Sequence, residues 1–116
     1  MRLTKAHKYH AKATVVDGVR FHSKREAARY QELKLLEKAG EIRDLELQPK
    51  FALHVPQSGW HSAPVTIGHF VADFRYREAN GMTVVEDVKG MKTLPLARWK
   101  HKHLLAQYGI RVREVR

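Results

Sequence analysis

The sequence predicts an α+β (α/β) fold in which helices flank a central mixed sheet and a β-hairpin comes first. Two observations carry this prediction. Apolar residues recur with the helical period in two segments and alternate with a period of two in four others, in the order helix, three strands, helix, strand (αβββαβ). The chain of 116 residues also has the length of one domain with a single modest core, so we expect one unit over residues 1–116.

The N-terminal part is predicted to be an arm followed by a hairpin. Residues 1–13 are basic and rich in histidine, and we expect this arm to become ordered only on nucleic acid. Asp17-Gly18 stands between two short β-branched runs, which predicts a hairpin over residues 14–22 with a two-residue turn. The αβββαβ core then occupies residues 23–116.

The first helix has clear signals at both ends. Ser23 is followed three residues later by Glu26, the spacing of a capping box, in which each side chain bonds a free backbone N–H group. Leu33 and Leu36 continue the apolar stripe, and Gly40 is a favourable residue for ending the helix.

Three strands are expected between the helices. Residues 41–48 look like a connector, and residues 56–64 contain two prolines, a glycine and two serines, which is typical of a loop. The predicted strands are residues 49–55, 69–77 and 82–89.

The C-terminal part is predicted as a helix and a strand. The helix runs from about Leu94 to Tyr108, with Pro95 acceptable in its first turn and Gly109 ending it. The last strand covers residues 110–115.

The turn at Asn80-Gly81 allows two registers. A two-residue loop places Asp73 opposite Val88, whereas a three-residue loop with Gly81 in the left-handed conformation places Asp73 opposite Asp87. The second register is favoured because it segregates apolar from charged side chains, and a one-residue slip would bury charge. One face then carries Phe70, Ala72, Phe74, Tyr76, Val84 and Val88, and the other carries Asp73, Arg75, Arg77, Thr83, Asp87 and Lys89.

This register predicts a metal site. Carboxylates directly opposite on neighbouring strands have Cβ atoms about 4.5–5.5 Å apart and repel each other unless a cation lies between them. Mg²⁺ or Mn²⁺ prefers such oxygen ligands, and Lys89 would stabilise charge that develops on a phosphoryl group. The competing interpretation is a surface acid cluster that is balanced by neighbouring Arg and Lys without a metal.

The charge of the chain points to a polyanionic partner, and nucleic acid is the commonest partner of this kind. Lysine and arginine exceed aspartate and glutamate by 22 to 12, which gives a net charge of +10. The absence of cysteine excludes disulfides and thiolate zinc sites, and no apolar run has membrane-spanning length. The basic side chains expected to bind nucleic acid are Lys5, Lys8, Lys12, Lys24, Arg25, Arg75, Lys92 and Lys102.

Four short motifs, in this order and spacing, resemble small phage-encoded members of the PD-(D/E)XK nuclease superfamily. They are Phe21-His22-Ser23-Lys24-Arg25-Glu26-Ala27, Leu45-Glu46-Leu47-Gln48-Pro49-Lys50-Phe51, Ala72-Asp73-Phe74-Arg75-Tyr76 and Glu86-Asp87-Val88-Lys89-Gly90. The resemblance covers residues 9–116 and implies a restriction-endonuclease-like core. It departs from the family at Ala72, where proline often stands.

By position, the resemblance implies that Glu26, Asp73, Asp87 and Lys89 are the catalytic residues. Glu26, Asp73, Asp87 and the Val88 carbonyl would hold the metal ion, with Gln48 in a supporting position. The spacing on the second helix, rather than the resemblance, adds Lys100 as a second supporting residue. Capping alone also explains Glu26, and Gln48 also suits the start of a strand. Glu86 is a rival ligand on the opposite face, and we expect it to pair with a basic side chain instead.

The second helix and the tryptophans carry weaker signals. Lys100, His103 and Gln107 fall on one stripe, which is either a solvated face or a contact with the scissile strand. His101 and His103 do not converge as zinc ligands. Trp60 and Trp99 are candidates for stacking on an unpaired base or for anchoring a loop or the core.

The resulting hypothesis is a metal-dependent endonuclease that hydrolyses DNA phosphodiesters, with branched or recombination intermediates of phage DNA metabolism as candidate substrates. It would act in the cytoplasm of a bacterial host. A homodimer is expected if two strands are cut symmetrically. The alternatives are a non-catalytic DNA-binding or recombination accessory protein on the same fold, or a nuclease directed at RNA.

Overall fold

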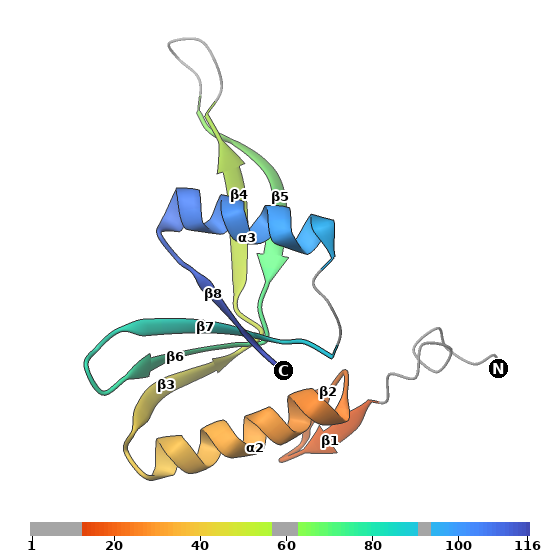
Figure 1. The fold of residues 1–116 in the computed structure, drawn as a ribbon, viewed down its shortest axis with the longest axis vertical. Helices are drawn as coiled ribbons and strands as arrows, with labels where there is room; N and C mark the ends of the chain where they lie inside the picture. Colours follow the sequence, from red (N-terminus) through yellow and green to blue (C-terminus); the bar gives the residue numbers. More distant parts are fainter. Residues whose placement is uncertain (1–12, 57–62, 91–93) are drawn as a thin grey trace, which may run out of the picture.

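The computed structural model describes residues 13–56, 63–90 and 94–116, and it confirms an α+β fold (Figure 1). The described residues form two helices and eight strands. In chain order these are β1 (Thr14–Val16), β2 (Val19–Phe21), α2 (Lys24–Lys38), β3 (Ile42–Leu47), β4 (Lys50–Val55), β5 (Val65–Val71), β6 (Phe74–Glu78), β7 (Thr83–Val88), α3 (Pro95–Tyr108) and β8 (Val112–Val115).

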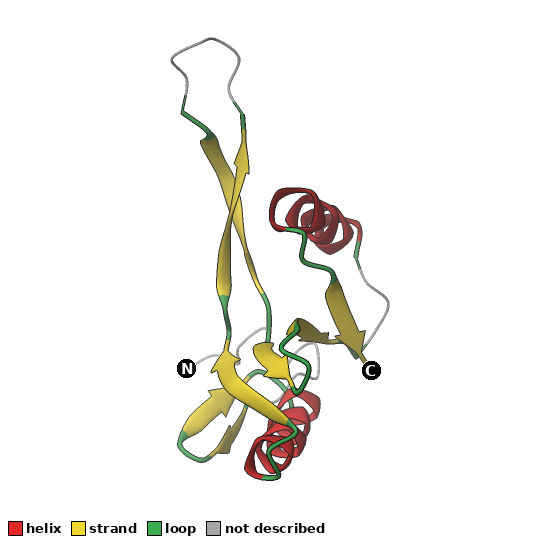
Figure 2. Cartoon of the chain, turned by 90° about the vertical axis from the view of Figure 1, so that its left-hand side faces the viewer, coloured by secondary structure: helices red, strands yellow, loops and turns green. Residues whose placement is uncertain are grey.

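The central sheet has four strands in the order β3-β6-β7-β8. It is mixed, because β7 and β8 are parallel while β3 pairs with β6, and β6 with β7, in antiparallel fashion. Two hairpins stand apart from it, β1–β2 and β4–β5. The β4–β5 hairpin extends well beyond the sheet in Figure 2.

One prediction about the strands was wrong, and another is confirmed only in part. Within residues 41–48, expected to be a connector, Ile42–Leu47 form the edge strand β3. Its alternation is broken by a register shift between Arg43 and Glu46 and by the left-handed Asp44 (φ 58°). The predicted strand 49–55 does form, as β4, but it pairs with β5 outside the central sheet. The αβββαβ order therefore holds with β3, β6 and β7 as its three strands and the β4–β5 hairpin inserted after the first.

The predicted strand 69–77 is divided between the two sheets. It breaks at Ala72-Asp73, where the chain leaves β5 and enters β6. Two backbone hydrogen bonds hold this crossing point, from Gln48 N to Asp73 O (2.9 Å) and from Ala72 N to Pro49 O (3.0 Å). Gln48 itself has a left-handed backbone (φ 51°), so both chains turn at the same place.

The predicted turns and helix ends are confirmed. Asp17 and Gly18 both have positive φ, as a two-residue hairpin turn requires. The Ser23 hydroxyl accepts a hydrogen bond from Glu26 N at 3.1 Å, and Gly109 ends α3 in the left-handed conformation (φ 71°). No helix in the described part of the chain is long and apolar enough to cross a membrane.

The three-residue loop at Asn80-Gly81 is also confirmed. Glu78 N donates to Met82 O, Gly81 N donates to Glu78 O, and Gly81 has φ 85°. The ladder continues to the pair Phe74 and Glu86, so the next position places Asp73 against Asp87.

The strands separate two apolar clusters. Helix α2 covers one side of the sheet, and α3 lies on the other side against the β4–β5 hairpin (Figure 1). Phe70 and Ala72 were expected to share a face with Phe74 and Tyr76, but they belong to the second cluster because the strand breaks at Asp73. The first cluster contains Phe21, Ala27, Tyr30, Leu33, Ile42, Phe74, Tyr76 and Val84, and the second contains Phe51, Leu53, Phe70, Ala72, Val85 and Leu104.

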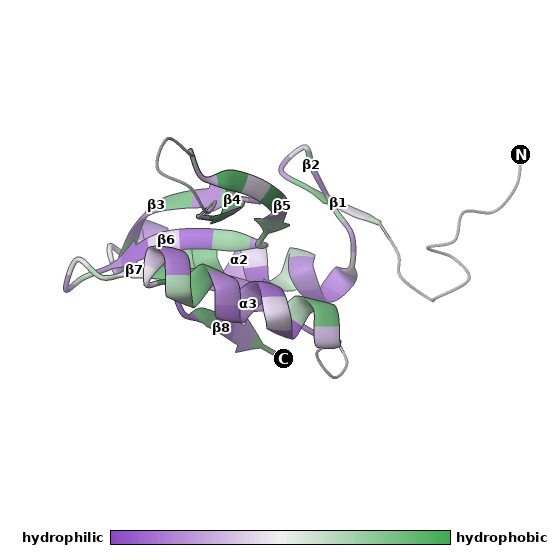
Figure 3. Ribbon diagram, turned by 90° about the horizontal axis from the view of Figure 1, so that it is seen from above, coloured by the Kyte–Doolittle hydropathy of each residue, from purple (hydrophilic) through white to green (hydrophobic). Residues whose placement is uncertain are grey.

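Helix α3 contributes to the second cluster with only part of its surface. Figure 3 shows hydrophilic and hydrophobic residues interspersed along this helix. Leu104 is its fully buried residue, whereas Leu96 and Trp99 are exposed. One stripe of α3 is therefore packed, and the remainder stays accessible near the end of β7.

Candidate functional site

The candidate site lies where β7 ends, beside the crossing point of the two sheets. Asp87 is the penultimate residue of β7 and is 4% exposed, and Lys89 follows the strand. Lys89 Nζ lies 3.2 Å from Asp87 Oδ2. The backbone of Lys89 is fixed by a hydrogen bond from its N–H to Val115 O at 2.7 Å, so the parallel strand β8 holds this end of β7 in place.

Asp73 meets Asp87 across the strands. Val88 N donates to Asp73 Oδ2 at 2.7 Å, and Asp73 N donates to Asp87 Oδ1 at 3.2 Å. The Asp73 carboxylate thus bonds a backbone N–H group of β7, and the Asp87 carboxylate bonds the backbone N–H group of Asp73. This exchange is possible because regular β6 begins only at Phe74.

Glu26 reaches the same place from the first turn of α2. Its side chain is buried and accepts a hydrogen bond from His22 N at 3.0 Å. In a regular capping box the donor would be the N–H of Ser23, so the bond is shifted by one residue. The Glu26 carboxyl also lies close enough to that of Asp73 to raise its pKa. Capping and proximity to Asp73 therefore occur together in one side chain.

The two aspartates are electrostatically strained. Burial raises the pKa of Asp73 to about 7, and the neighbouring Glu26 carboxyl contributes in the same direction. Burial likewise raises the pKa of Asp87; Lys89 opposes this shift, while the charge of Asp73 adds to it. Carboxylates gathered in this way are stabilised by a nearby cation, and Lys89 supplies a single positive charge.

His101 is a site residue that the sequence interpretation missed. Its Nε2 lies 3.4 Å from Asp87 Oδ2 and its Nδ1 lies 4.0 Å from Glu114 Oε2, while its ring packs edge-on against Phe70. Its spacing from His103 argues against shared zinc binding but does not bear on a contact with another element. The signal that points to His101 is its position between Ala97 and Leu104, on the helix stripe that faces the second cluster.

Glu86 is paired with a basic side chain, as expected. Arg29 donates two hydrogen bonds to it, at 2.9 Å from Nε and 2.7 Å from Nη2. Tyr76 donates a third from its hydroxyl. This carboxylate lies on the α2 side of β7 and has no contact with Asp87 among those described.

Of the two supporting residues, Lys100 lies close to the site and Gln48 acts through its backbone. Lys100 lines a cavity of about 420 Å³ together with Asp87 and Lys89. Gln48 is exposed, and its N–H holds Asp73 in place through the carbonyl of that residue.

His103 and Gln107, predicted to share either a solvated or a DNA-contacting stripe with Lys100, instead dock α3 on β4. His103 Nε2 lies 2.7 Å from His54 O. The Gln107 amide accepts from His54 N at 2.7 Å and donates to Ala52 O at 3.2 Å. The irregular register of β4 at Leu53 and His54 leaves these backbone groups available to the helix.

The basic residues predicted to bind nucleic acid occupy different environments. Arg25 lies near Gly90, the residue after Lys89. Its Nε is 3.8 Å from the position that a Cβ atom would take on this glycine. Arg75 is held by Glu46 (2.9 Å from Nε) and by the ring of Phe51. Lys24 and Lys102 are exposed, as is Trp99. Lys5, Lys8, Lys12, Trp60 and Lys92 lie outside the described residues.

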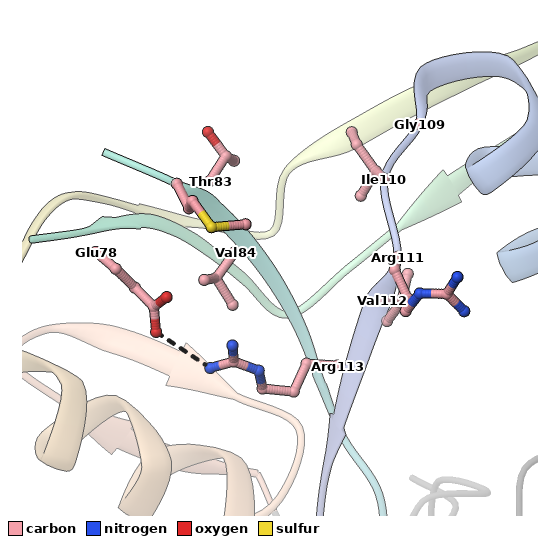
Figure 4. A pocket seen from close by; sticks show the side chains of 9 residues that line it. Glu78, Thr83, Val84, Gly109, Ile110, Arg111, Val112 and Arg113 are labelled. Atoms are coloured by element: carbon pink, nitrogen blue, oxygen red, sulfur yellow. Dashed lines mark hydrogen bonds and ion pairs between the residues drawn. The ribbon is translucent and has the colours of Figure 1, made fainter. Parts of the chain in front are cut away.

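A second cavity, of about 530 Å³, lies at the other end of β7 (Figure 4). Thr83 and Val84 line it from β7, and Ile110 and Val112 line it from the C-terminal segment. An ion pair between Arg113 and Glu78 (3.5 Å) crosses one side. None of the predicted site residues lines this cavity.

The candidate site has the donor chemistry of a magnesium or manganese site. Its donors are carboxylate oxygens, with a carbonyl at Val88, and such oxygen ligands suit these ions. Within the described ranges, no three or more histidine, aspartate or glutamate side chains are already arranged to hold a metal ion. One oxygen of each aspartate is instead bonded to a backbone N–H group.

Comparison with known proteins gives one match. A family model described as a protein of unknown function (DUF1064) matches residues 6–115. No curated protein and no solved structure matches the chain. Because the model spans nearly the whole sequence, the chain belongs to the DUF1064 family.

Proposed function

We propose that this protein is a metal-dependent endonuclease that hydrolyses DNA phosphodiester bonds. The observation that carries the proposal is the meeting of three buried or half-buried carboxylates, Glu26, Asp73 and Asp87, beside Lys89 at the end of β7. Fold stability alone gives no reason to gather like charges there.

In this proposal the carboxylates and the lysine have different roles. Glu26, Asp73, Asp87 and the Val88 carbonyl would hold Mg²⁺ or Mn²⁺, which when bound polarises a phosphoryl oxygen and lowers the pKa of its water ligand. Lys89, 3.2 Å from Asp87, is placed to donate hydrogen bonds to the negative charge that develops on the phosphoryl oxygens. Held by β8 through its backbone, it needs little reorganisation to do so.

The charge distribution supports a nucleic-acid substrate. The net charge is +10, Lys100 lines one cavity with Asp87 and Lys89, and the Arg25 side chain lies close to Gly90, the residue after Lys89. Contacts of this kind attract phosphates without reading sequence. Branched DNA remains our candidate substrate, and symmetric cutting of a junction would require two copies of the chain.

In the decisive experiment, the wild-type protein is incubated with labelled linear, flap or four-way-junction DNA, or with single-stranded RNA. Each reaction contains Mg²⁺, Mn²⁺ or EDTA, and cleavage is measured. Asp87→Asn is the test variant, and Glu78→Gln is its control, because Glu78 is a carboxylate of the same sheet outside the site. We expect metal-dependent cutting that Asp87→Asn loses and Glu78→Gln retains.

Three outcomes would contradict the proposal. Equal cleavage by Asp87→Asn and wild type would show that this site does not carry out the cleavage. Salt-sensitive binding with no cutting in any metal would instead support the DNA-binding accessory protein, and cutting of RNA alone would change the substrate.

A further inference from the structure

The cavity of about 420 Å³ beside Asp87 and Lys89 has features that phosphodiester hydrolysis alone does not require. Its wall is formed by the end of β5 and the start of α3. A volume of this size falls in the range of small-molecule sites, about 300–1,000 Å³. It is therefore large enough for a group that lies next to the reacting phosphate.

Part of the lining of this cavity is apolar and open to solvent. Val71, Leu94 and Leu96 line it, and they are 52%, 64% and 68% exposed. Phe70 also lines the cavity and is buried. Single exposed apolar residues are ordinary on protein surfaces, whereas three large ones at one cavity indicate a binding site.

Two other lining residues, Lys89 and Lys100, are cationic. His69 also lines the cavity, and Asp87 is its one acidic lining residue among those described. A ligand that suits both the apolar and the cationic lining residues carries negative charge on one part and a flat or apolar surface on another. A nucleotide has this combination, with its phosphate beside its base.

We propose that this cavity receives an unpaired nucleobase that flanks the scissile phosphate, so that the substrate is DNA with a single-stranded nucleotide at the cut. The inference rests on the proposed function, because it places the phosphate at Asp87 and Lys89. A base within a duplex is stacked and paired, and it has to leave the stack before it can enter a side pocket. An unpaired base has a free face that apolar side chains can cover.

Binding of oligonucleotides in EDTA tests the cavity separately from cleavage. The variant Val71→Ser/Leu96→Ser removes two lining side chains. Its control is Ile67→Ser/Leu35→Ser, because Ile67 lies on the same strand and is 57% exposed, and Leu35 lies on the other helix and is 68% exposed. Neither control residue lines the cavity.

We expect the test variant to bind a fluorescent single-stranded 20-mer about fivefold more weakly than wild type, near the lower end of base-stacking effects. Its affinity for the matching duplex should stay unchanged, and the control variant should match wild type on both. A similar loss on single-stranded RNA would also support the cavity and show that it contacts the base rather than the sugar. Unchanged single-strand affinity in a folded test variant would overturn the inference.

A second arm uses only the wild-type protein, so that it does not depend on the variants folding. One abasic nucleotide is moved through the single-stranded part of a flap substrate, and the rate of cutting with Mg²⁺ is measured for each position. We expect the rate to fall about fivefold at one nucleotide adjacent to the cut. Equal rates at every position would overturn the inference while leaving the nuclease activity established.

The two proposals can fail separately. If no substrate is cut but the test variant still loses single-strand affinity, the cavity binds bases and the proposed function is wrong. If cutting depends on metal and Asp87 while neither arm shows a base effect, the nuclease stands and the cavity has no such role.

Discussion

Glu86 and Asp87 are neighbours on β7 and almost equally buried, at 0% and 4% exposed, yet their surroundings are opposite. Glu86 points to the α2 side and accepts three hydrogen bonds from Arg29 and Tyr76. Asp87 points to the α3 side and meets a second aspartate. One strand thus carries an acid that is fully compensated beside an acid that is not.

The compensated side has the properties of a structural ion pair. The Glu86 carboxylate raises the pKa of Arg29 above its usual value. Burial raises the pKa of Tyr76 to about 12, and its hydrogen bond to Glu86 contributes next. Both groups therefore keep the protonation state that serves Glu86 throughout the neutral range, and together they join α2 to β7.

The uncompensated side has the properties of a binding site. The pKa values of Asp73 and Asp87 are both raised, so their charged forms are disfavoured in the ligand-free protein. A perturbed carboxylate pair beside a lysine is a frequent mark of a functional site. The comparison teaches that burial alone does not distinguish a structural acid from a functional one, whereas the partners do.

Removing the lysine from the uncompensated side should have the largest effect. We expect Lys89→Ala to lower the rate of DNA cleavage by roughly 10³-fold, because one positioned donor to developing charge is worth about that much. Its affinity for DNA in EDTA should change little, since many other cations contribute. Single-turnover kinetics measure the rate, and Lys34→Ala, on the exposed face of α2, is the control. A rate within a factor of three of wild type would show that Lys89 is not part of the chemistry.

Breaking the compensated side should act on stability instead. We expect Arg29→Ala to lower the free energy of unfolding by about 3 kcal/mol, because it leaves the buried Glu86 carboxylate without its cation. Urea denaturation at pH 7 measures the change. The double variant Arg29→Met/Glu86→Leu should recover only part of the loss, since it removes the unpaired charge but leaves the buried Tyr76 hydroxyl without its acceptor. A loss below about 0.5 kcal/mol would equate this pair with an exposed salt bridge.

The pH dependence of stability should sharpen the contrast. The folded pKa of Asp73, at about 7, lies above its usual value, so its contribution to stability is present below about pH 4 and is lost as the pH rises through 7. Relative to Asp73→Asn, which does not titrate, the metal-free wild type should therefore become less stable between pH 4 and 7. Mg²⁺ should restore stability most at pH 8, above the pKa of Asp73, where this carboxylate is charged. Thermal unfolding of both proteins, with EDTA or Mg²⁺, measures this; parallel pH profiles would contradict the assignment.

Much of the contrast between Glu86 and Asp87 could be predicted from the sequence, because local rules govern the relevant elements. The loop at Asn80-Gly81 and the alternation of β7 place Asp73 against Asp87 and Glu86 on the opposite face. The division of residues 69–77 between two sheets could not be predicted in this way, since it depends on hydrogen bonds to Gln48 and Pro49, which are distant in sequence.

The contribution of α3 to the site escaped prediction for the same reason. Periodicity identifies an apolar stripe on a helix, but it does not say which element the stripe covers. His101 lies on that stripe and reaches Asp87 only because His103 and Gln107 dock α3 on the irregular backbone of β4. Its role depends on tertiary structure that no local motif encodes.

His101 and His103 provide the finest test of the difference between site and scaffold. They lie two residues apart on α3, and each places its Nε2 atom beside an oxygen of another element: Asp87 Oδ2 for His101, and His54 O for His103. Replacing either by Phe keeps a ring and removes the polar contact. We expect His101→Phe to lower the cleavage rate about tenfold, the lower end for a residue that orients a metal ligand, with little loss of stability.

His103→Phe should show the reverse, with a loss of about 1 kcal/mol in unfolding free energy and a smaller change in rate. The Mg²⁺ concentration that gives half-maximal activity separates orientation from general damage. It should rise in His101→Phe, because Asp87 loses a neighbour that fixes its carboxylate, and stay constant in His103→Phe. If both variants change stability and leave the Mg²⁺ dependence alone, His101 belongs to the scaffold, and the uncompensated region ends at Asp73, Asp87, Glu26 and Lys89.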